Sequence, residues 1–493
     1  MNFSSVKLNI VFNGIDFKLC QGANENMLVN DIAFNTNTVS GDSLFFCVRG
    51  TVTDGHKFAE KAIDAGACAL VVDHELDLNF PQVIVKDTRY ALAVCSSNFF
   101  DKPSSKLDLV GITGTNGKTT TTFLVEHICN RLKIKAGVIG TVECRIDGKT
   151  YPTANTTPES RELQEMFALM IKAGCKVCAM EVSSHALCMG RLESTKFKIG
   201  AFTNLTQDHL DFHKDMQDYF NAKLKLFSDF NLDSCVVCTD SEYGKRVADE
   251  CRKANSGKLI TVGSSASCDL RITNAEFMPH STSLQLAYDG HVIQIALPLV
   301  GKFNVENAIV ACGIGIALGF DFADICDALE FAPQVPGRIE RVIGKDGKIP
   351  SFGVLVDYAH TPDAISNVIS SLKSVTKGRI ICVFGCGGDR DRSKRPKMAQ
   401  AACQADIAVV TTDNPRTEDP NAIIEDILEG VKDRSNLEVV VDRREAISYA
   451  LKIARPCDAV LIAGKGHEDY QDVMGVKHHF DDREVAAEEL ERI

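Results

Sequence analysis

A glycine-rich loop between a predicted strand and a predicted helix constrains this chain more than any other stretch. Residues 111–120 (GITGTNGKTT) follow the apolar run 107–110 and precede a helical pattern through Leu124, Val125 and Ile128. In such a loop, backbone N–H groups surround phosphate oxygens at the helix N-terminus, a lysine adds positive charge, and a threonine hydroxyl ligates Mg²⁺. The pattern therefore predicts a nucleoside-triphosphate site formed by Gly114, Thr115, Asn116, Gly117, Lys118, Thr119 and Thr120.

The alternative for this stretch is a glycine-rich turn with a solvated lysine. The common phosphate loop has a glycine where this chain has Ile112, so the general spacing is met only in part. The order of strand, loop and helix nevertheless favours nucleotide binding.

Length and charge limit the remaining possibilities. With 493 residues, the chain is long enough for about three domains. Its net charge of −12 argues against nucleic-acid binding and leaves any anionic ligand to local basic clusters, such as residues 390–397. No stretch approaches 18 consecutive apolar residues, and the first 20 residues lack a signal-peptide pattern. We expect a cytoplasmic monomer that neither spans a membrane nor binds nucleic acid.

The 19 cysteines are scattered, and most lie inside apolar runs. This pattern is typical of buried, reduced thiols in a cytosolic protein. Two C-x-x-C pairs, Cys175/Cys178 and Cys235/Cys238, raise the alternative of a zinc site. Both pairs lie in strand-like runs, where positions three apart point to opposite faces, so core packing is favoured.

Predicted strands alternate with predicted helices, which indicates an α/β fold with three domains. We expect a small α/β domain over residues 1–107, a central doubly wound sheet over residues 108–336 and a Rossmann-like sheet over residues 337–493. The boundaries fall at the linker 101–105 and at the proline- and glycine-rich stretch 333–338. The main strands are predicted at 44–48, 67–72, 81–85, 107–110, 136–139, 177–182, 199–203, 235–238, 354–356, 379–384, 407–411, 438–441 and 459–462.

Polar residues follow several strands of the predicted central sheet. Glu181 and the pair Asp208-His209 could hold a divalent metal beside the phosphates, because strand ends meet at one edge of a parallel sheet. Residues 155–159 (NTTPE) offer hydrogen-bonding side chains, with a helix cap containing Pro158 in the first turn as the alternative. Residues 218–225 read as an ordinary amphipathic helix, in which nothing singles out Lys223.

Further on, two asparagines share one face of a predicted helix that runs to Leu318. Asn304 and Asn307 could read a purine edge, with simple capping as the alternative. In the last predicted domain, polar clusters follow four strands and predict one binding face. They are residues 357–360, 385–392, 413–416 and 464–468.

Taken together, these motifs make the chain similar to the Mur ligase family along nearly its whole length. The segments that carry the resemblance occur in the family's order: Gly114 to Thr120, Glu181 to His185, Thr203 to Leu205 with Asp208 to Asp211, Gly301 to Ala308, Asp357 to Asp363 and Asp413 to Arg416. The resemblance implies an N-terminal UDP-binding domain, a central P-loop ATPase and a C-terminal domain that binds the incoming amino acid.

Within the family, the chain resembles members that add the third residue of the peptidoglycan stem peptide. This implies ATP-dependent ligation of meso-2,6-diaminopimelate to the D-glutamate of UDP-N-acetylmuramoyl-L-alanyl-D-glutamate. ATP phosphorylates the carboxylate, and the amine then attacks the acyl phosphate. The implied cofactors are ATP, Mg²⁺ and a carbamoylated lysine at Lys223.

The resemblance also assigns roles to single residues. Lys118 neutralises the transferring phosphate, and Thr119 and Glu181 bind one Mg²⁺. His209 helps with a second, and Lys223, once carbamoylated, becomes a carboxylate-like metal ligand. ATP contacts fall on Asn304, Arg338 and Asp357, and muramoyl-dipeptide contacts on Thr36, Thr156, Thr157, Ser183 and Arg191. Amino-acid contacts fall on Arg390, Asp413, Asn414, Pro415, Arg416, Gly464 and Glu468, with Arg416 facing the distal carboxylate and Glu468 the distal ammonium.

Two departures from the family pattern concern the UDP-substrate. Met189 stands where glutamine is common, and Asn35-Thr36-Asn37 replaces the usual Asp-Ser-Arg. Three other functions remain open. They are the same ligase acting on L-lysine, a folylpolyglutamate synthetase, which would lack residues 1–107 and the 413–416 motif, and a non-catalytic nucleotide-binding scaffold.

Overall fold

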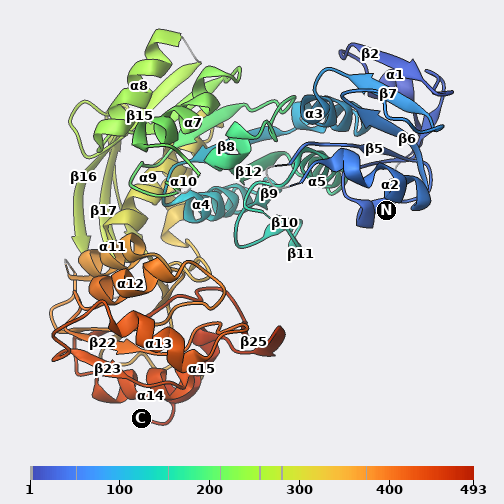
Figure 1. Cartoon of the computed structure of the whole chain (residues 1–493). Helices are drawn as coiled ribbons and strands as arrows, with labels where there is room; N and C mark the ends of the chain where they lie inside the picture. Colours follow the sequence, from blue (N-terminus) through green and yellow to red (C-terminus); the bar gives the residue numbers. More distant parts are fainter. Residues whose placement is uncertain are drawn as a thin grey trace. The chain divides into compact units, whose positions relative to one another are not determined.

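The structure of the chain is a computed structural model that describes residues 4–50, 53–153, 155–210, 212–254, 257–278, 281–373 and 375–493. The chain divides into two compact units (Figure 1). One comprises Met1–Leu270 with Val310–Ile325, and the other Arg271–Ile309 with Cys326–Ile493. The predicted α/β class is confirmed, and the predicted domain boundaries at 107/108 and 336/337 stay predictions.

The N-terminal part of the first unit is a sheet covered on both faces. Its strand order is β2-β7-β6-β5-β4, with β4 to β7 parallel and β2 antiparallel. Alternate residues of β6 point to opposite faces, so Ala69 and Val71 pack with helices α1 and α3, whereas Leu70 and Val72 pack with α2. The elements are β2 Phe17–Cys20, β4 Asp31–Ala33, β5 Ser43–Phe46, β6 Ala67–Val72, β7 Gln82–Val85, α1 Leu8–Val11, α2 Ala59–Asp64 and α3 Thr88–Phe99, with the small pair β1 Val6–Lys7 and β3 Leu28–Val29.

A parallel sheet forms the rest of the first unit, with the order β9-β12-β8-β13-β14-β15 and the antiparallel strands β10 and β11 beside β9. The strand order reverses at β8, which places a topological switch point at the carboxyl end of that strand. The strands are β8 Asp108–Thr113, β9 Ala136–Ile139, β10 Cys144–Ile146, β11 Lys149–Tyr151, β12 Val177–Glu181, β13 Ile199–Phe202, β14 Ser234–Cys238 and β15 Lys258–Gly263.

Helices α5, α7 and α8 pack against this sheet in one apolar core, and α4 contacts β8, β9 and β12. The helices are α4 Lys118–Arg131, α5 Ser160–Lys172, α6 Ser184–Cys188, α7 Met216–Ser228 and α8 Glu242–Ala254. The sequence predicted the strands near β8, β9, β12, β13 and β14 but not β10, β11 or β15.

In the second unit, a largely parallel sheet lies between two layers of helices (Figure 1). Its order is β19-β20-β24-β21-β22-β23, with β19 antiparallel. Helices α11 to α13 share one core with the sheet, and α14 and α15 share the other. The elements are β19 Glu340–Arg341, β20 Gly353–Asp357, β21 Ile380–Phe384, β22 Ile407–Val410, β23 Leu437–Val439, β24 Ala459–Ala463, α11 Pro362–Lys373, α12 Arg395–Ala402, α13 Pro420–Leu428, α14 Arg443–Ile453 and α15 Asp482–Leu490.

Several strands in residues 270–300 and 470–479 were not predicted from the sequence. They are β16 Leu270–Phe277, β17 Thr282–Tyr288, β18 His291–Leu297, β25 Tyr470–Val473 and β26 Val476–His479, and the helices α9 Lys302–Ala317 and α10 Phe322–Glu330 follow β18. Among the described residues, no helix combines the length and apolar character that a bilayer crossing requires.

The cysteines of the two C-x-x-C pairs are buried, as expected for core thiols. Cys178 lies on β12 and Cys235 on β14, as predicted. Cys175 precedes β12, so the prediction that it lies in a strand is wrong. Burial raises the pKa of Cys382, in the second unit, to about 12. Cys188 and Cys457 are exposed, so the buried-thiol expectation does not extend to them.

A buried ion pair between α14 and α15 generates a stability prediction. Arg443 donates to both carboxylate oxygens of Asp482 at 2.7 and 2.6 Å, and both side chains are 0% exposed. Replacing Arg443 with methionine leaves a buried carboxylate without its partner, which should lower the free energy of unfolding by about 3–5 kcal/mol. Urea denaturation of the full chain measures this loss. It is read from the unfolding transition that involves the second unit.

The matched control is the neighbouring arginine. Arg444 pairs with Glu488 at 2.9 Å, but its side chain is 40% exposed, so Arg444→Met should cost only about 0–1 kcal/mol. Equal losses in the two variants would show that burial does not set the value of these ion pairs.

Candidate active site

The glycine loop leaves β8 through Gly114, whose φ is +150°. A Cβ atom at this position would lie 1.9 Å from Thr203 Oγ1, so the end of β13 can approach only a glycine. The loop is then fixed by Asn204, whose carbonyl accepts a hydrogen bond from Thr115 N–H at 2.9 Å and whose Oδ1 accepts from Asn116 N–H at 3.0 Å. The loop conformation therefore depends on a segment that follows another strand.

Helix α4 begins directly after Gly117, which has a φ of +87°. The Lys118 ammonium donates to the carbonyls of Gly114 and Thr115 at 2.9 and 2.8 Å, so the side chain lies over the loop. Positive charge and helix N–H groups thus meet at one point, which is the arrangement that binds phosphate oxygens.

Glu181 ends β12 beside this loop and is 1% exposed. Its Oε1 accepts hydrogen bonds from Thr119 Oγ1 at 2.9 Å and from Thr141 N–H at 2.8 Å, and Thr141 Oγ1 donates to Oε2 at 3.1 Å. Gly140 makes room for the carboxylate, because a Cβ atom there would lie 2.4 Å from Oε1. A hydroxyl and a carboxylate are hard oxygen donors, so Thr119 and Glu181 fit the predicted Mg²⁺.

Lys223 is buried on α7, with 2% of the residue exposed. Its Nζ donates to the Gly114 carbonyl at 2.8 Å and lies 4.6 Å from the centroid of the Tyr219 ring. Burial, reinforced by the charge of Lys118, lowers the pKa of Lys223 well below its ordinary value. The amphipathic pattern of this helix gave no sign of this environment.

His209 follows β13 with a φ of +53°. Its ring lies 5.0 Å from the His185 ring, and its Nε2 lies 3.6 Å from Asp208 Oδ2. The side chain is 45% exposed, which leaves it more accessible than Glu181. Asp211, the last residue of this motif, lies outside the described residues.

The residues predicted to contact the muramoyl dipeptide form a hydrogen-bonded layer beside Glu181. Thr157 Oγ1 donates to the Glu181 carbonyl at 2.8 Å and accepts from Ser183 N–H at 3.0 Å, while Thr156 Oγ1 lies 2.9 Å from Thr141 Oγ1. Helix α5 begins at Ser160. The alternative of a cap with Pro158 in the first turn is therefore wrong, because Pro158 precedes the helix and the Thr157 hydroxyl binds the end of β12 instead.

Arg191 joins this layer from the segment after α6. Its Nη1 donates to the Thr157 carbonyl at 3.0 Å and its Nε lies 2.8 Å from Glu159 Oε1. Nη2 contacts the sulfur of Met189 at 3.5 Å, the position where the family commonly has glutamine. Thr36 lies in a 3₁₀ turn, Thr36–Thr38, that Asn35 caps by accepting from Asn37 N–H at 3.0 Å.

Of the predicted ATP contacts on the second unit, Asn304 and Asp357 are buried and Arg338 is half-buried. Asn304 lies inside α9 and donates to the Val300 carbonyl at 2.8 Å, so the capping alternative is wrong. Asp357 ends β20 and accepts from the N–H groups of Ile339 and Ala359, both at 2.8 Å. Burial raises the pKa of Asp357, and the charge of Arg338 opposes this rise.

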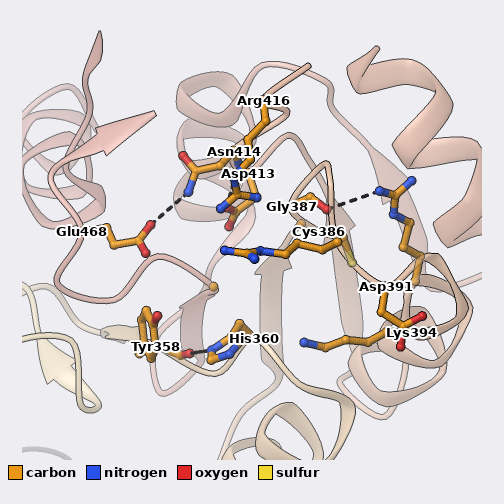
Figure 2. Close-up of a pocket in the computed structure, with 14 residues that line it drawn as sticks. Tyr358, His360, Cys386, Gly387, Asp391, Lys394, Asp413, Asn414, Arg416 and Glu468 are labelled. Carbon is orange, nitrogen blue, oxygen red and sulfur yellow. Dashed lines mark hydrogen bonds between the residues drawn. The ribbon is translucent and has the colours of Figure 1, made fainter. Parts of the chain in front are cut away.

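The four polar clusters of the second unit line a single cavity of about 340 Å³ at the carboxyl ends of β20, β21, β22 and β24 (Figure 2). The four clusters thus meet at one edge of the sheet, and binding at this face stays a prediction. The cavity wall includes six of the seven predicted amino-acid contacts, namely Arg390, Asp413, Asn414, Arg416, Gly464 and Glu468. Pro415 is the exception. Its carbonyl oxygen packs against Gly388, and a Cβ atom added to that glycine would lie 1.9 Å from this oxygen.

A hydrogen-bonded chain orients one side of this cavity, as Figure 2 shows for Asn414 and Glu468. Asn414 Nδ2 donates to Glu468 Oε2 at 3.0 Å, and Asn414 Oδ1 accepts from Lys465 Nζ at 3.2 Å. Lys465 is fully buried and lies 3.7 Å from Glu468 Oε2. Burial raises the pKa of Glu468, and the charge of Lys465 opposes this rise. Lys465 was not predicted as a functional residue, although its neighbours Gly464 and Glu468 were predicted contacts.

Arg416 also lines the cavity, and its Nη1 donates to the Gly388 carbonyl at 2.7 Å. The basic cluster 390–397 is only partly available to a ligand. Arg395 is 1% exposed and pairs with Glu418 and Asp426, both at 2.7 Å, so it has a structural role. Arg392 also pairs with Asp426, at 3.0 Å. Arg390 and Lys394 line the cavity, as does the paired Arg395.

Fold and sites together define a class of enzyme. A phosphate-binding loop with hard oxygen ligands lies at a switch point of one parallel sheet, and a second sheet carries a small cavity with charges of both signs. Such a chain combines nucleotide chemistry with the binding of a small charged molecule.

Comparison with known proteins gives the family. Residues 112–315 match the profile of the Mur ligase middle domain, residues 337–466 the Mur ligase glutamate ligase domain and residues 29–108 the Mur ligase family catalytic domain. The chain is 42% and 41% identical to proteins of Clostridium botulinum and Clostridioides difficile named UDP-N-acetylmuramoyl-L-alanyl-D-glutamate--2,6-diaminopimelate ligase, over 99% of this chain and 100% of each relative. A solved structure with the same name is 30% identical, with a TM-score of 0.72 over 99% of both chains. The chain belongs to the Mur ligase family.

Proposed function

We propose that this chain ligates meso-2,6-diaminopimelate to the D-glutamate of UDP-N-acetylmuramoyl-L-alanyl-D-glutamate, with ATP as the energy source. The reaction belongs to cytoplasmic peptidoglycan precursor synthesis, and we expect a monomer. The observation that carries the proposal is the cavity of Figure 2, which presents the Arg416 guanidinium and the Glu468 carboxylate in a chain that matches diaminopimelate ligases over its whole length.

The first step transfers the terminal phosphoryl group of ATP to the D-glutamyl carboxylate. The Lys118 ammonium and the N–H groups at the start of α4 neutralise the charge on the moving phosphoryl group. Thr119 and Glu181 would hold a Mg²⁺ ion, which supplies further charge neutralisation, and His209 would serve a second ion. Asn304, Arg338 and Asp357 would bind the nucleotide.

The second step forms the amide bond. The amine of the incoming amino acid attacks the acyl phosphate carbon, the C–O bond to phosphate breaks, and inorganic phosphate leaves. The protein mainly holds the two substrates in line for this attack. Thr36, Thr156, Thr157, Ser183 and Arg191 would hold the UDP-muramoyl dipeptide, with residues 1–107 as the UDP-binding domain, residues 108–336 as the ATPase and residues 337–493 as the amino-acid domain.

Lys223 would act as a carbamate. Its lowered pKa favours the neutral amine, which attacks CO₂ to form an N–C bond and releases a proton. The product is an anion in place of a cation, which removes the repulsion from Lys118 and supplies oxygen ligands for Mg²⁺.

Arg416 would select diaminopimelate over lysine, because the two differ by one carboxylate at the far end of the side chain. Its hydrogen bond to the Gly388 carbonyl orients the guanidinium without neutralising it. Glu468, held by Asn414, would bind the distal ammonium that both amino acids carry.

The test of the proposed activity is phosphate release from ATP, which should require both the UDP-muramoyl dipeptide and diaminopimelate. Lys118→Ala should lower this rate by about 10²–10³-fold, because it removes an oxyanion-stabilising contact. The control is Lys135→Ala, since Lys135 donates to the Ala173 carbonyl at 3.3 Å at the surface of the same unit. Release without the dipeptide, or a Lys118→Ala rate above a tenth of wild type, would contradict the assignment.

Carbamoylation of Lys223 can be observed directly. In the presence of ¹³C-labelled bicarbonate, wild-type protein should show a carbamate carbon signal in NMR spectra that disappears on mild acidification, since protonated amines do not react with CO₂. Lys223→Ala should lack this signal and lose activity. Lys225→Ala, on the same helix, should keep both; a signal that survives Lys223→Ala would place the carbamate elsewhere.

Specificity can be tested by competition. Arg416→Ala should lower kcat/KM for diaminopimelate by roughly 10–150-fold, because a charge-assisted hydrogen bond contributes about 1.5–3 kcal/mol. The rate with lysine should change little. Arg392→Ala is the control, because Arg392 pairs with Asp426. If wild-type enzyme given both amino acids at equal concentration consumes mainly lysine, the specificity proposal is wrong while the family assignment stands.

A further inference from the structure

A second cluster of ionisable side chains lies far along the chain from the glycine loop, at the carboxyl ends of β5 and β6. Asp73 and His74 directly follow β6, and His56 lies in a 3₁₀ turn, Gly55–Phe58, after the end of β5. These parallel strands pair directly, so their ends meet at one edge of the N-terminal sheet. None of the roles assigned above uses this cluster.

The three side chains offer ligand atoms at one point. One nitrogen of each histidine and one oxygen of Asp73 all lie within 4.8 Å of one another. His56 Nε2 lies 3.3 Å from Asp73 Oδ1, and His74 Nδ1 makes a short contact with the same oxygen. The two imidazole rings are 4.9 Å apart. This spacing allows all three atoms to reach one cation after small side-chain rotations.

His56 is oriented by a carboxylate behind it. Asp54 Oδ1 lies 2.6 Å from His56 Nδ1, which places the proton on Nδ1 and leaves the lone pair of Nε2 directed toward Asp73. The Asp73 N–H lies 3.3 Å from Nε2, a long contact that fits an acceptor at this atom. A carboxylate that fixes the tautomer of a histidine is the usual outer partner of a metal-binding imidazole.

Asp73 is oriented in turn by Arg49. The guanidinium donates to Asp73 Oδ2 at 2.6 Å and, less closely, to Oδ1 at 3.2 Å. The Arg49 side chain is 61% exposed and can move away from Oδ1 without loss of packing. His56 is 6% exposed and His74 55%, so the site has a rigid wall and an open side that a water ligand can occupy.

We propose that His56, Asp73 and His74 form a binding site for a zinc-like divalent cation. Two imidazole nitrogens and one carboxylate oxygen match the ligands of Zn²⁺, whereas Mg²⁺ prefers oxygen alone. The site is therefore chemically distinct from the oxygen set of Thr119 and Glu181. A bound ion would join the 3₁₀ turn to the end of β6 and so stabilise this edge of the N-terminal sheet.

Location is tested with the full chain in crystals that contain excess MgCl₂ and are soaked in ZnCl₂. Anomalous diffraction at the zinc edge should show a peak among His56, Asp73 and His74. The thiols and the histidines near the glycine loop would also attract Zn²⁺, so the position of the peak matters more than its existence. Peaks confined to those other groups would overturn the proposal.

Affinity is tested in solution with Co²⁺, whose visible spectrum reports nitrogen and oxygen ligands. Asp54→Asn, which removes the outer partner, should weaken binding by about 10–100-fold, and His74→Ala should weaken it at least as much. His291→Ala, at the start of β18, is the control and should leave the titration unchanged. Identical titrations for wild type and His74→Ala would overturn the proposal. If the variants do not fold, the anomalous map of the wild type decides alone.

Discussion

Two lysines converge on a single carbonyl, and the architecture of the first unit depends on this point. Lys118 and Lys223 donate to the oxygen of Gly114 at 2.9 and 2.8 Å, while the α-carbon of the same glycine faces Thr203 so closely that no side chain fits. Burial disfavours the charged form of Lys223, and the positive charge of Lys118 adds to this effect, so the pKa of Lys223 lies well below its ordinary value. The glycine thus sets the loop shape and accepts hydrogen bonds from lysines on two different helices.

The sequence could predict this loop because its chemistry is local, but it could not predict the partners that arrive from elsewhere. Glycines, a lysine and threonines in one short run suffice to define a phosphate loop. The burial of Lys223 depends on how α7 packs, and the helix pattern over residues 218–225 contains other residues equally able to face the core. The cap alternative at residues 155–159 failed for the same reason, since the Thr157 hydroxyl binds the end of β12, which is another segment of the chain. The missed strands β16 and β18 have mostly half-exposed or exposed residues, so they lack the alternation that makes a strand recognisable.

For the cavity of the second unit, the sequence predicted residues that come from separate strands. Its residues were found because polar clusters after successive parallel strands must meet at one edge, whatever the details of packing. Their connections were not predictable, because they depend on side-chain geometry. Lys465 is the clearest case: it lines no part of the cavity, yet it fixes which way the Asn414 amide points and so which atom meets Glu468. Without the nearby charge of Lys465, the half-buried Glu468 carboxylate would more readily take up a proton, and a neutral acid binds an ammonium poorly.

Net charge gives little guidance to what these sites bind. The chain carries a net charge of −12, yet two of its proposed ligands, ATP and the UDP-muramoyl dipeptide, are themselves anions. The local environment decides which arginines can bind an anion, because some are neutralised by carboxylates and others are not. The charge of Arg395 is neutralised by Glu418 and Asp426, and that of Arg443 by Asp482. These arginines therefore stabilise the fold. Arg416 instead donates to a backbone carbonyl, which fixes the direction of its guanidinium and leaves the charge to act on a ligand. A cation held by a neutral partner loses less conformational entropy on binding than a free one, and this preorganisation favours an amino acid whose far end carries a carboxylate.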